Sequence, residues 1–568
     1  MVSKLKRRDF FKGAGTGVLA SLAGASLFSS LNCTSRKSLS GEYPFPYDSE
    51  AFEASERIAF LSDQKAFVNV IPRAGQSLDI KLFRSEDKNS ISGSPPLSYS
   101  GVKDSLNIPV SGVLSGPELF YRLEYRANSK GKWMATPERR VRTPVAFQES
   151  GRMDVLLISD DHTFDDGDMV QRIVNDPALI EMRLSGDYVN FFLQELRQNR
   201  HYVPDESTDP GKMMSGFCLA SAISTILKNE TPDLIILMGD TTGIGAGYKW
   251  KGLGLKDTDL TSRDYDDISR ILWLRERRML SALTPSIPIY LVLGNHDGEI
   301  GFDSARIPAG TYRRKYFKQP GAAEGGSSSE NYYPLFWGDR SSEQGVPLFV
   351  VLDSDGSIRR EWPKRPEEWT LGSDQKEWFK KILPYETNWK FVFFHNVIGG
   401  WPRGSDEQMF DYCYGRGPLF TYEDHQGMCP NPHRVEQVEL TEVMMKNGVR
   451  ANFYGHDHIF HVKEISAEFG SGQKRMFGIC AGSTKHRGEL GWYKGELWKK
   501  YYGSFGRFWT EPHAVSEKTD FWGPSGYTKL TISRWGTRVE YKRAANNNGH
   551  TNIPLFVGLG DVVASRIL

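Results

Sequence analysis

The 568-residue chain has few cysteines and no excess of charge of either sign. Its cysteines, at positions 33, 218, 413, 429 and 480, form no CxxC pair, which argues against a disulfide scaffold and against zinc-thiolate chemistry. In an oxidising compartment, Cys413 and Cys429 are the two that could close a loop. Lysine and arginine number 71 against 70 aspartates and glutamates. No global field would therefore draw the protein to nucleic acid or to a membrane surface, and any attraction for an anionic substrate must be local.

The N-terminus lacks an uninterrupted apolar segment. Arg7 and Arg8 are followed by a run of glycine, alanine, leucine and serine from 13 to 31, in which the glycines dilute the apolar character. We interpret residues 1–33 as an export signal rather than a membrane anchor. The paired arginines resemble a twin-arginine signal, which predicts export of the folded protein to the periplasm or cell surface by the twin-arginine machinery. The alternative is an ordinary secretory signal. Cys33 is a candidate for a lipid anchor, although the residues before it match a lipobox poorly.

A chain of this length is too long for one compact core, which predicts two or more domains. Residues 45–148 have the period-two pattern of half-buried antiparallel strands, as in Leu78–Leu82 and Tyr121–Arg126. We expect a small all-β domain here, a fibronectin III-like sandwich. The segment holds no cluster of titratable residues, so we interpret it as a spacer or docking module.

From residue 150 onward, short apolar runs stop abruptly at polar residues. The six runs are 155–158, 234–238, 289–293, 348–352, 391–394 and 451–454. Runs that are apolar at nearly every position predict strands covered on both faces. Helical periodicity in Asp264–Leu283 and Asp374–Leu383 lies between them. We therefore expect an α/β domain over 150–545, with a C-terminal extension over 546–568, and polar residues gathered at the carboxyl ends of the strands.

The polar residues at these strand ends are candidate metal ligands. Asp160 and His162 are two residues apart, so in an extended chain both side chains point to the same side. Asp240 offers a carboxylate that can bridge two cations. Each group alone would more simply be an exposed turn or an incidental histidine, but five of them at successive strand ends are hard to obtain by chance. The candidate ligands are Asp160, His162, Asp240, Asn295, His395, His456 and His458. Oxygen and nitrogen donors of this kind suit Mn, Fe, Zn or similar ions.

Taken in order, these residues resemble the signature of the calcineurin-like metallophosphoesterase superfamily. Its DxH, GD, GNH, lone His and GHxH motifs are matched by Asp160/His162, Gly239/Asp240, Gly294/Asn295/His296, His395 and Gly455/His456/His458. The resemblance covers about residues 152 to 460 and implies a four-layer fold, a β-sandwich flanked by helices. With an all-β domain ahead of it, the arrangement is similar to that of purple acid phosphatases and of secreted PhoD-type phosphatases.

The resemblance implies two metal ions. One would be held by Asp160, His162, Asp240 and His458, and the second by Asp240, Asn295, His395 and His456. One departure is informative, because purple acid phosphatases carry a tyrosine three residues after the GD aspartate and this chain has Gly243 there. A purple ferric-tyrosinate site is therefore not expected.

We predict an exported enzyme that hydrolyses phosphomonoesters or phosphodiesters of small molecules by in-line attack of a metal-bridging hydroxide. His296, outside the ligand set, would stabilise the transition state and protonate the leaving oxygen, and Asp297 would orient its imidazole. One alternative is a nucleotide or phospholipid-headgroup hydrolase, which the aromatic segment Trp492–Trp522 would favour. The other is a non-catalytic binding protein on the same scaffold. Degenerate scaffolds usually lose a ligand or the catalytic histidine, whereas this chain has all of them.

Overall fold

The computed structural model describes residues 47–48, 50–110, 112, 114–127, 130–162, 215–242, 262–297, 310–343, 345–354, 371–396, 436–456, 460–469, 472–484, 526–544 and 562–568. All of them belong to one compact unit, Pro44–Leu568. Outside the described residues lie the predicted export signal with Cys33, the pair Cys413 and Cys429, the candidate ligand His458 and the aromatic segment Trp492–Trp522.

The N-terminal part contains two antiparallel sheets. The first has the order β1-β2-β5, built from Arg57–Phe60, Ala66–Val70 and Leu106–Val110. The second has the order β4-β3-β6-β7 with β8 also paired to β6, built from Leu97–Val102, Leu78–Ser85, Glu118–Arg126, Met134–Ala135 and Arg139–Arg142. A 3-10 helix, η1 (Lys88–Gly93), follows β3. The predicted period of two is visible in β3, where Leu78, Ile80 and Leu82 are buried and their neighbours are partly exposed. The likeness to a fibronectin III domain stays a prediction.

Buried polar groups join these sheets to the rest of the molecule. The Ser55 hydroxyl donates to the carbonyl of Ser281 at 2.8 Å, and the Tyr121 hydroxyl donates to the carbonyl of Pro285 at 2.6 Å. Both sheets also contribute to an apolar cluster that continues into the α/β part. Because a buried carbonyl that loses its donor is costly, these contacts make the N-terminal sheets part of the folded core rather than a loosely tethered module.

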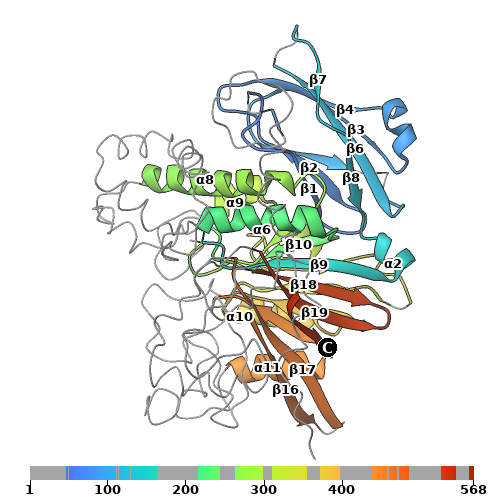
Figure 1. Cartoon of the computed structure of the whole chain (residues 1–568), viewed down its shortest axis with the longest axis vertical. Coiled ribbons are helices and arrows are strands. Elements are labelled where there is room, and N and C mark those ends of the chain that lie inside the picture. The colour runs from blue at the N-terminus through green and yellow to red at the C-terminus, as the bar shows by residue number, and fades with distance from the viewer. Residues whose placement is uncertain are drawn as a thin grey trace, which may run out of the picture. The chain divides into compact units, whose positions relative to one another are not determined.

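Two six-stranded sheets form the α/β part (Figure 1). The first has the order β11-β10-β9-β18-β19-β20, built from Ile289–Leu291, Leu234–Leu237, Arg152–Ile158, Gly526–Ser533, Gly536–Arg543 and Val562–Ile567. The second has the order β12-β13-β14-β15-β17-β16, built from Tyr333–Phe336, Leu348–Val351, Lys390–Phe393, Ala451–Tyr454, Gly472–Ala481 and Phe460–Phe469. All six predicted apolar runs are strands. Strand β20 arises from the segment that we assigned to a C-terminal extension, and it pairs with β19.

The strands that carry the candidate ligands are parallel within each sheet. In the first sheet β10 pairs in parallel with β9 and β11. In the second sheet β14 pairs in parallel with β13 and β15. Parallel neighbours place their carboxyl ends at the same edge, so each sheet collects its polar termini on one side.

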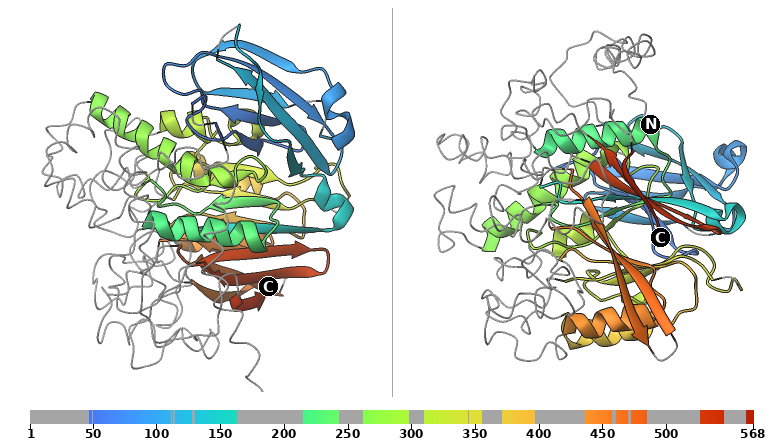
Figure 2. Two further views of the ribbon diagram at one scale, coloured as in Figure 1. Left: turned by 45° about the horizontal axis from the view of Figure 1, so that its top comes forward. Right: turned by 60° about the horizontal axis from the view of Figure 1, so that its bottom comes forward.

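Helices complete a mixed α/β architecture, as expected. They are α2 (Ala146–Ser150), α6 (Ser215–Asn229), α8 (Ser262–Met279) with η4 (Leu280–Ala282), α9 (Gly310–Tyr316), η5 (Ala322–Glu324), α10 (Ser373–Ile382) and α11 (Glu436–Lys446). Phe379 of α10 and Met444 of α11 pack with Val350 and Val392, on the outer face of the second sheet. The inner faces of the two sheets share one apolar cluster. Helices α6 and α8 lie along the first sheet (Figures 1 and 2).

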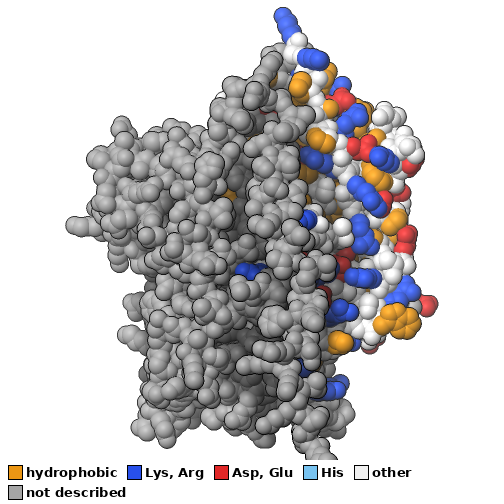
Figure 3. Space-filling view, in the orientation of Figure 1, with side chains coloured by type: hydrophobic (Ala, Val, Ile, Leu, Met, Phe, Trp, Pro, Cys, Tyr) orange, Lys and Arg blue, Asp and Glu red, His pale blue; other side chains and the backbone are white. Residues whose placement is uncertain are grey.

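The part of the described surface that is visible in Figure 3 carries mixed charge. In the space-filling view, lysine and arginine side chains alternate with aspartate and glutamate, with apolar side chains between them (Figure 3). Among the residues that the structure describes, no helix combines the length and apolar character needed to cross a bilayer. Cys480 is buried and not disulfide-bonded.

The junction between the N-terminal sheets and the core is open to a mutational test. Tyr121→Phe removes the hydroxyl that donates to Pro285 and leaves a buried carbonyl without that donor. We expect the free energy of unfolding, measured by urea denaturation, to fall by about 1–3 kcal/mol. Tyr99→Phe, at a partly exposed position on β4, is the matched control and should change stability by less than about 0.5 kcal/mol. Equal effects of the two substitutions would contradict this account of the junction.

Candidate metal centre

The described candidate ligands converge at the carboxyl ends of five strands. Asp160 and His162 follow β9, Asp240 follows β10, and Asn295 follows β11 in the first sheet. His395 follows β14 and His456 follows β15 in the second sheet. Asp240 lies close to His395, and Asp160 accepts from His456, so the strand ends of the two sheets meet. The candidate site therefore lies where the two sheets come together.

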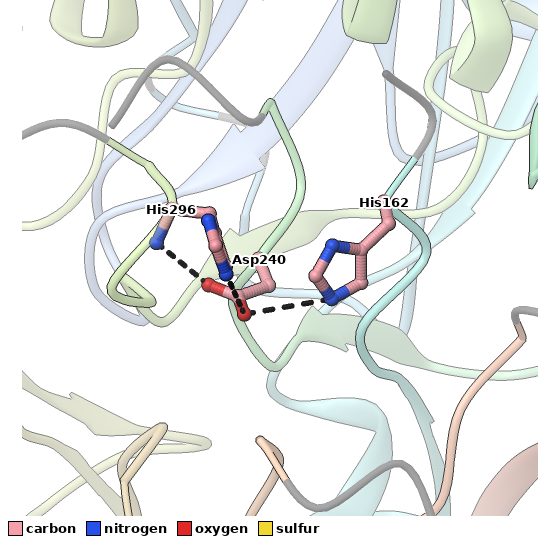
Figure 4. Close-up of side chains that lie close together, drawn as sticks. All are labelled: His162, Asp240 and His296. Atoms are coloured by element: carbon pink, nitrogen blue, oxygen red, sulfur yellow. Dashed lines mark hydrogen bonds and ion pairs between the residues drawn. The ribbon is translucent and has the colours of Figure 1, made fainter. Parts of the chain in front are cut away.

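Asp240 is at the centre of this group. Its Oδ2 atom lies 3.2 Å from His395 Nε2, 3.5 Å from His162 Nε2 and 3.8 Å from His296 Nε2. Figure 4 shows His162 and His296 approaching this carboxylate from two sides. Burial by itself would raise the pKa of Asp240, but the neighbouring imidazoles of His395, His296 and His162 outweigh it and hold the pKa well below its usual range. The carboxylate is therefore ionised and available to cations.

Two groups of potential ligand atoms share Asp240. His162, Asp240 and His296 form one, and Asp240, His395 and His456 form the other, with the ligand atoms of each group within 4.8 Å of one another. The second group contains three of the four ligands expected for one metal ion. The first contains His162 and Asp240, expected for the other ion, together with His296. A carboxylate common to both groups could therefore contact a cation in each of them.

Hydrogen bonds orient the imidazoles of His395 and His456. His395 is fully buried, and its Nδ1 lies 2.7 Å from the carbonyl oxygen of Met238. Because a carbonyl only accepts, Nδ1 carries a proton, and Nε2, on the Asp240 side, is the ring nitrogen that could bind a cation. His456 Nδ1 lies 3.0 Å from Asn295 Oδ1, so these two potential ligand atoms lie side by side.

Asp160 is bound from both sheets. The backbone N–H of His456 donates to its Oδ1 at 3.0 Å and to its Oδ2 at 3.1 Å. The Ser159 hydroxyl also donates to Oδ2. Oδ1 lies 3.9 Å from Nε2 of both His162 and His395. The carboxylate therefore ties the end of β9 to the end of β15 while one oxygen faces the imidazoles.

Backbone conformation at the site is unusual. Asp160, His162, Asp240 and His456 have φ values of 49°, 42°, 55° and 69°. Side-chain-bearing residues rarely adopt this left-handed region, and in the described part of the chain Glu330 is the one further non-glycine residue with positive φ. Such strain, about 1–3 kcal/mol per residue, persists where the surroundings over-determine it, and it clusters at functional sites.

Two motif glycines are required by close approach. A Cβ atom on Gly294 would lie 2.3 Å from the backbone N and from Oδ1 of Asp240. A Cβ atom on Gly455 would lie 2.5 Å from Ser159 Oγ and 2.7 Å from Asp160 Oδ2. Both distances are shorter than any real Cβ contact, so larger residues would displace the carboxylates.

Asp297 holds the Asp240 loop. Its Oδ2 accepts from the backbone N–H groups of Asp240 at 3.0 Å and Gly294 at 2.8 Å. Its Oδ1 accepts from the backbone of Thr241 and Thr242, each at 2.9 Å, and from the Thr242 hydroxyl at 3.2 Å. Burial and the charge of Asp240 raise the pKa of Asp297 to about 6, so at neutral pH it is predominantly ionised, as an acceptor-only group must be. We expected Asp297 to orient the His296 ring, whereas each of these hydrogen bonds comes from the loop of residues 240–242 or from Gly294.

Sequence reasoning passed over two serines at the site. Ser159 donates to the side chain of Asp160, and Ser483 donates to its backbone carbonyl at 2.8 Å. Ser159 directly precedes the DxH motif, which could have drawn attention to it. Ser483 follows β17 in the segment Ala481-Gly482-Ser483, a strand end of the same kind as the others but without a metal-binding side chain.

A family model covers part of the chain that carries this site. Residues 215–460 match the family model of the calcineurin-like phosphoesterases. The matched segment includes Asp240, Asn295, His395 and His456, and it begins after Asp160 and His162. A search of curated proteins found no match to this sequence.

Among solved structures, the chain is similar to purple acid phosphatase PPD1, isolated from yellow lupin (Lupinus luteus) seeds. The TM-score is 0.48 and the sequence identity 12%, over 90% of this chain and 74% of that chain. A likeness this distant supports no conclusion about activity. The family model, matched by a segment that holds the GD, GNH, lone-His and GHxH motifs in order, is the firmer finding. Residues 215–460 are therefore similar to the calcineurin-like phosphoesterases, in agreement with the motifs read from the sequence.

Proposed function

We propose that the protein is an exported, two-metal hydrolase of phosphomonoesters or phosphodiesters. The observation that carries the proposal is the position of Asp240, whose carboxylate belongs to both groups of potential ligand atoms. The match of residues 215–460 to the calcineurin-like phosphoesterases supports phosphoester hydrolysis as the reaction class. The twin-arginine-like residues near the N-terminus support export to the periplasm or cell surface.

The donor atoms fit a pair of small cations. Ligand atoms about 2.1 Å from one ion and about a right angle or a tetrahedral angle apart are separated by roughly 3.0–3.4 Å. Asp240 Oδ2 and His395 Nε2 are 3.2 Å apart, Asn295 Oδ1 and His456 Nδ1 are 3.0 Å apart, and His162 Nε2 lies 3.5 Å from Asp240 Oδ2. Oxygen and imidazole donors without thiolate suit Mn, Fe or Zn.

The expected ligand sets are compatible with this arrangement. One ion would be held by Asp160, His162 and Asp240 together with His458, which lies outside the described residues. The second would be held by Asp240, Asn295, His395 and His456. When bound, two such ions lower the pKa of water and neutralise phosphoryl oxygens, which permits in-line attack on phosphorus.

His296 is the group best placed to transfer a proton. Its side chain is 17% exposed, against 4% for His162 and 0% for His395, so it lies on the open side of the site. Its backbone N–H donates to Asp240 Oδ1 at 2.8 Å, which fixes the residue beside the carboxylate. Its ring centroid lies 5.2 Å from that of His162. From this position it would stabilise charge on the phosphoryl group and protonate the leaving oxygen.

Metal analysis combined with two chromogenic substrates tests the proposal. Purified protein loaded with Mn²⁺ should contain two ions per chain by the bridging argument, and should hydrolyse nitrophenyl phosphate, bis-nitrophenyl phosphate or both. The preference between these substrates would separate a monoesterase from a diesterase. Two bound ions without activity on any phosphate ester would instead indicate a binding protein on the same scaffold. A panel of nucleotides and phospholipid headgroups would then define the substrate class.

Asp240 should be required for both ions. Asp240→Asn removes the charge shared by the two groups, so we expect fewer than one ion per chain and a loss of turnover of at least about 100-fold. Asp353→Asn is the matched control, because Asp353 is equally buried at the end of β13 but belongs to neither group. It should retain both ions. If the Asp240→Asn protein keeps two tightly bound ions, the bridging role is wrong.

His296→Ala separates proton transfer from metal binding. We expect turnover of an alkyl phosphate, whose leaving group needs a proton, to fall about 10²–10⁴-fold. Nitrophenyl phosphate, whose leaving group departs as a stable anion, should lose much less. Metal content, measured on the same preparation, should be unchanged. Loss of an ion would place His296 among the ligands, and an equal loss on both substrates would exclude it as the proton donor.

A further inference from the structure

The backbone of Asp160 is clamped between two segments. Its N–H donates to the carbonyl of Gly239 at 3.1 Å, on the side of β10. Its carbonyl accepts from the Ser483 hydroxyl at 2.8 Å, on the side of β17. The next hydrogen bond along, from Thr484 N–H to the carbonyl of Ser159 at 3.1 Å, fixes the preceding residue. The left-handed conformation at Asp160 is therefore bonded on both of its backbone polar groups.

Ser483 is itself held by the C-terminal hairpin. Its carbonyl accepts from the Gly526 N–H at 3.0 Å and from the Tyr541 hydroxyl at 3.2 Å. Ser483 is 2% exposed and Tyr541 is 1% exposed, so water does not compete for these bonds. At Gly482, whose φ is +80°, a Cβ atom would lie 2.4 Å from the Tyr541 ring. The turn therefore fits closely against this tyrosine.

The same tyrosine also contacts strand β16. The ring of Tyr541 stacks on Phe460 with 4.7 Å between centroids and 7° between planes. Phe460 begins β16, two residues after the GHxH motif. Through its ring, Tyr541 contacts the strand that follows His458 in the sequence. Through its hydroxyl, it bonds to Ser483, the residue that donates to Asp160.

We infer that Ser483 is a positioning residue of the proposed metal centre, with Tyr541 holding it in place. The inference rests on the proposed function, because it concerns how tightly Asp160 can grip a cation. If the Ser483 hydroxyl is removed, the strained backbone of Asp160 can relax toward an ordinary conformation and rotate its carboxylate away from His162. Groups that orient a ligand in this way are worth about 10–100-fold in metal affinity.

The test is the Mn²⁺ affinity of the metal-free full-length protein, measured by calorimetry. Ser483→Ala should weaken binding at the weaker or both sites by about 10–100-fold, and Ser483→Thr, which keeps the hydroxyl, should restore much of it. Ser55→Ala is the matched control, since it deletes an equally buried hydroxyl bonded to a carbonyl at the same 2.8 Å, far along the chain from any ligand. It should lower the urea midpoint as much as Ser483→Ala without changing affinity.

Tyr541→Phe provides a second measurement that does not depend on Ser483→Ala folding. It deletes the bond to the Ser483 carbonyl and keeps the ring on Phe460, so a smaller loss of Mn²⁺ affinity is expected. Wild-type affinity in both Ser483→Ala and Tyr541→Phe would overturn the inference and leave the proposed function intact. An equal loss in Ser55→Ala would also overturn it, because the effect would then reflect stability alone. Failure of the unmodified protein to bind Mn²⁺ would contradict the proposed function itself, and this inference with it.

Discussion

The arrangement of the site depends on a carboxylate placed among imidazoles and held there by another carboxylate. Asp240 faces His162, His296 and His395, and its backbone is fixed by Asp297, which accepts from three successive N–H groups of that loop. Two buried acids so close together would repel each other in a dry interior. Backbone N–H groups around one of them and imidazoles around the other make the pair tolerable. Cations would remove the remaining excess of negative charge.

This constraint explains why the site lies where two sheets meet. Each sheet supplies only part of the described candidate ligands. These are Asp160, His162, Asp240 and Asn295 from the first sheet and His395 and His456 from the second. The hydrogen bond from His456 N–H to Asp160 and the contact between His456 Nδ1 and Asn295 Oδ1 cross between them. The apolar cluster shared by the inner faces of the sheets sets their separation, so packing far from the site fixes the distances within it.

The sequence predicted the strands and the candidate ligands for a common reason. Runs such as 155–158 and 391–394 are apolar at every position because both faces of each strand are covered, and the residue that ends such a run must face the open edge. The sequence did not predict the partners of Asp297. Its adjacency to His296 suggested that the two side chains interact, but neighbouring side chains in a turn point in different directions. Ser483 left no signal, since a serine after a strand is common. The pairing of β18 with β9 joins segments about 370 residues apart, and no local sequence pattern indicates it. The hydrogen bond from Thr531 to Asp154, for example, joins residues 377 positions apart.

The contact of Tyr541 with Ser483 has a consequence for the order of events during synthesis. Tyr541 is 58 residues after Ser483, and Ser483 is 323 residues after Asp160. A residue near the end of the chain therefore supports an aspartate that leaves the ribosome nearly four hundred residues earlier. A nascent chain therefore presents its first acidic and imidazole groups long before they can be locked into shape. Under the proposed function, the site would become fully competent for cation binding only when translation is almost finished.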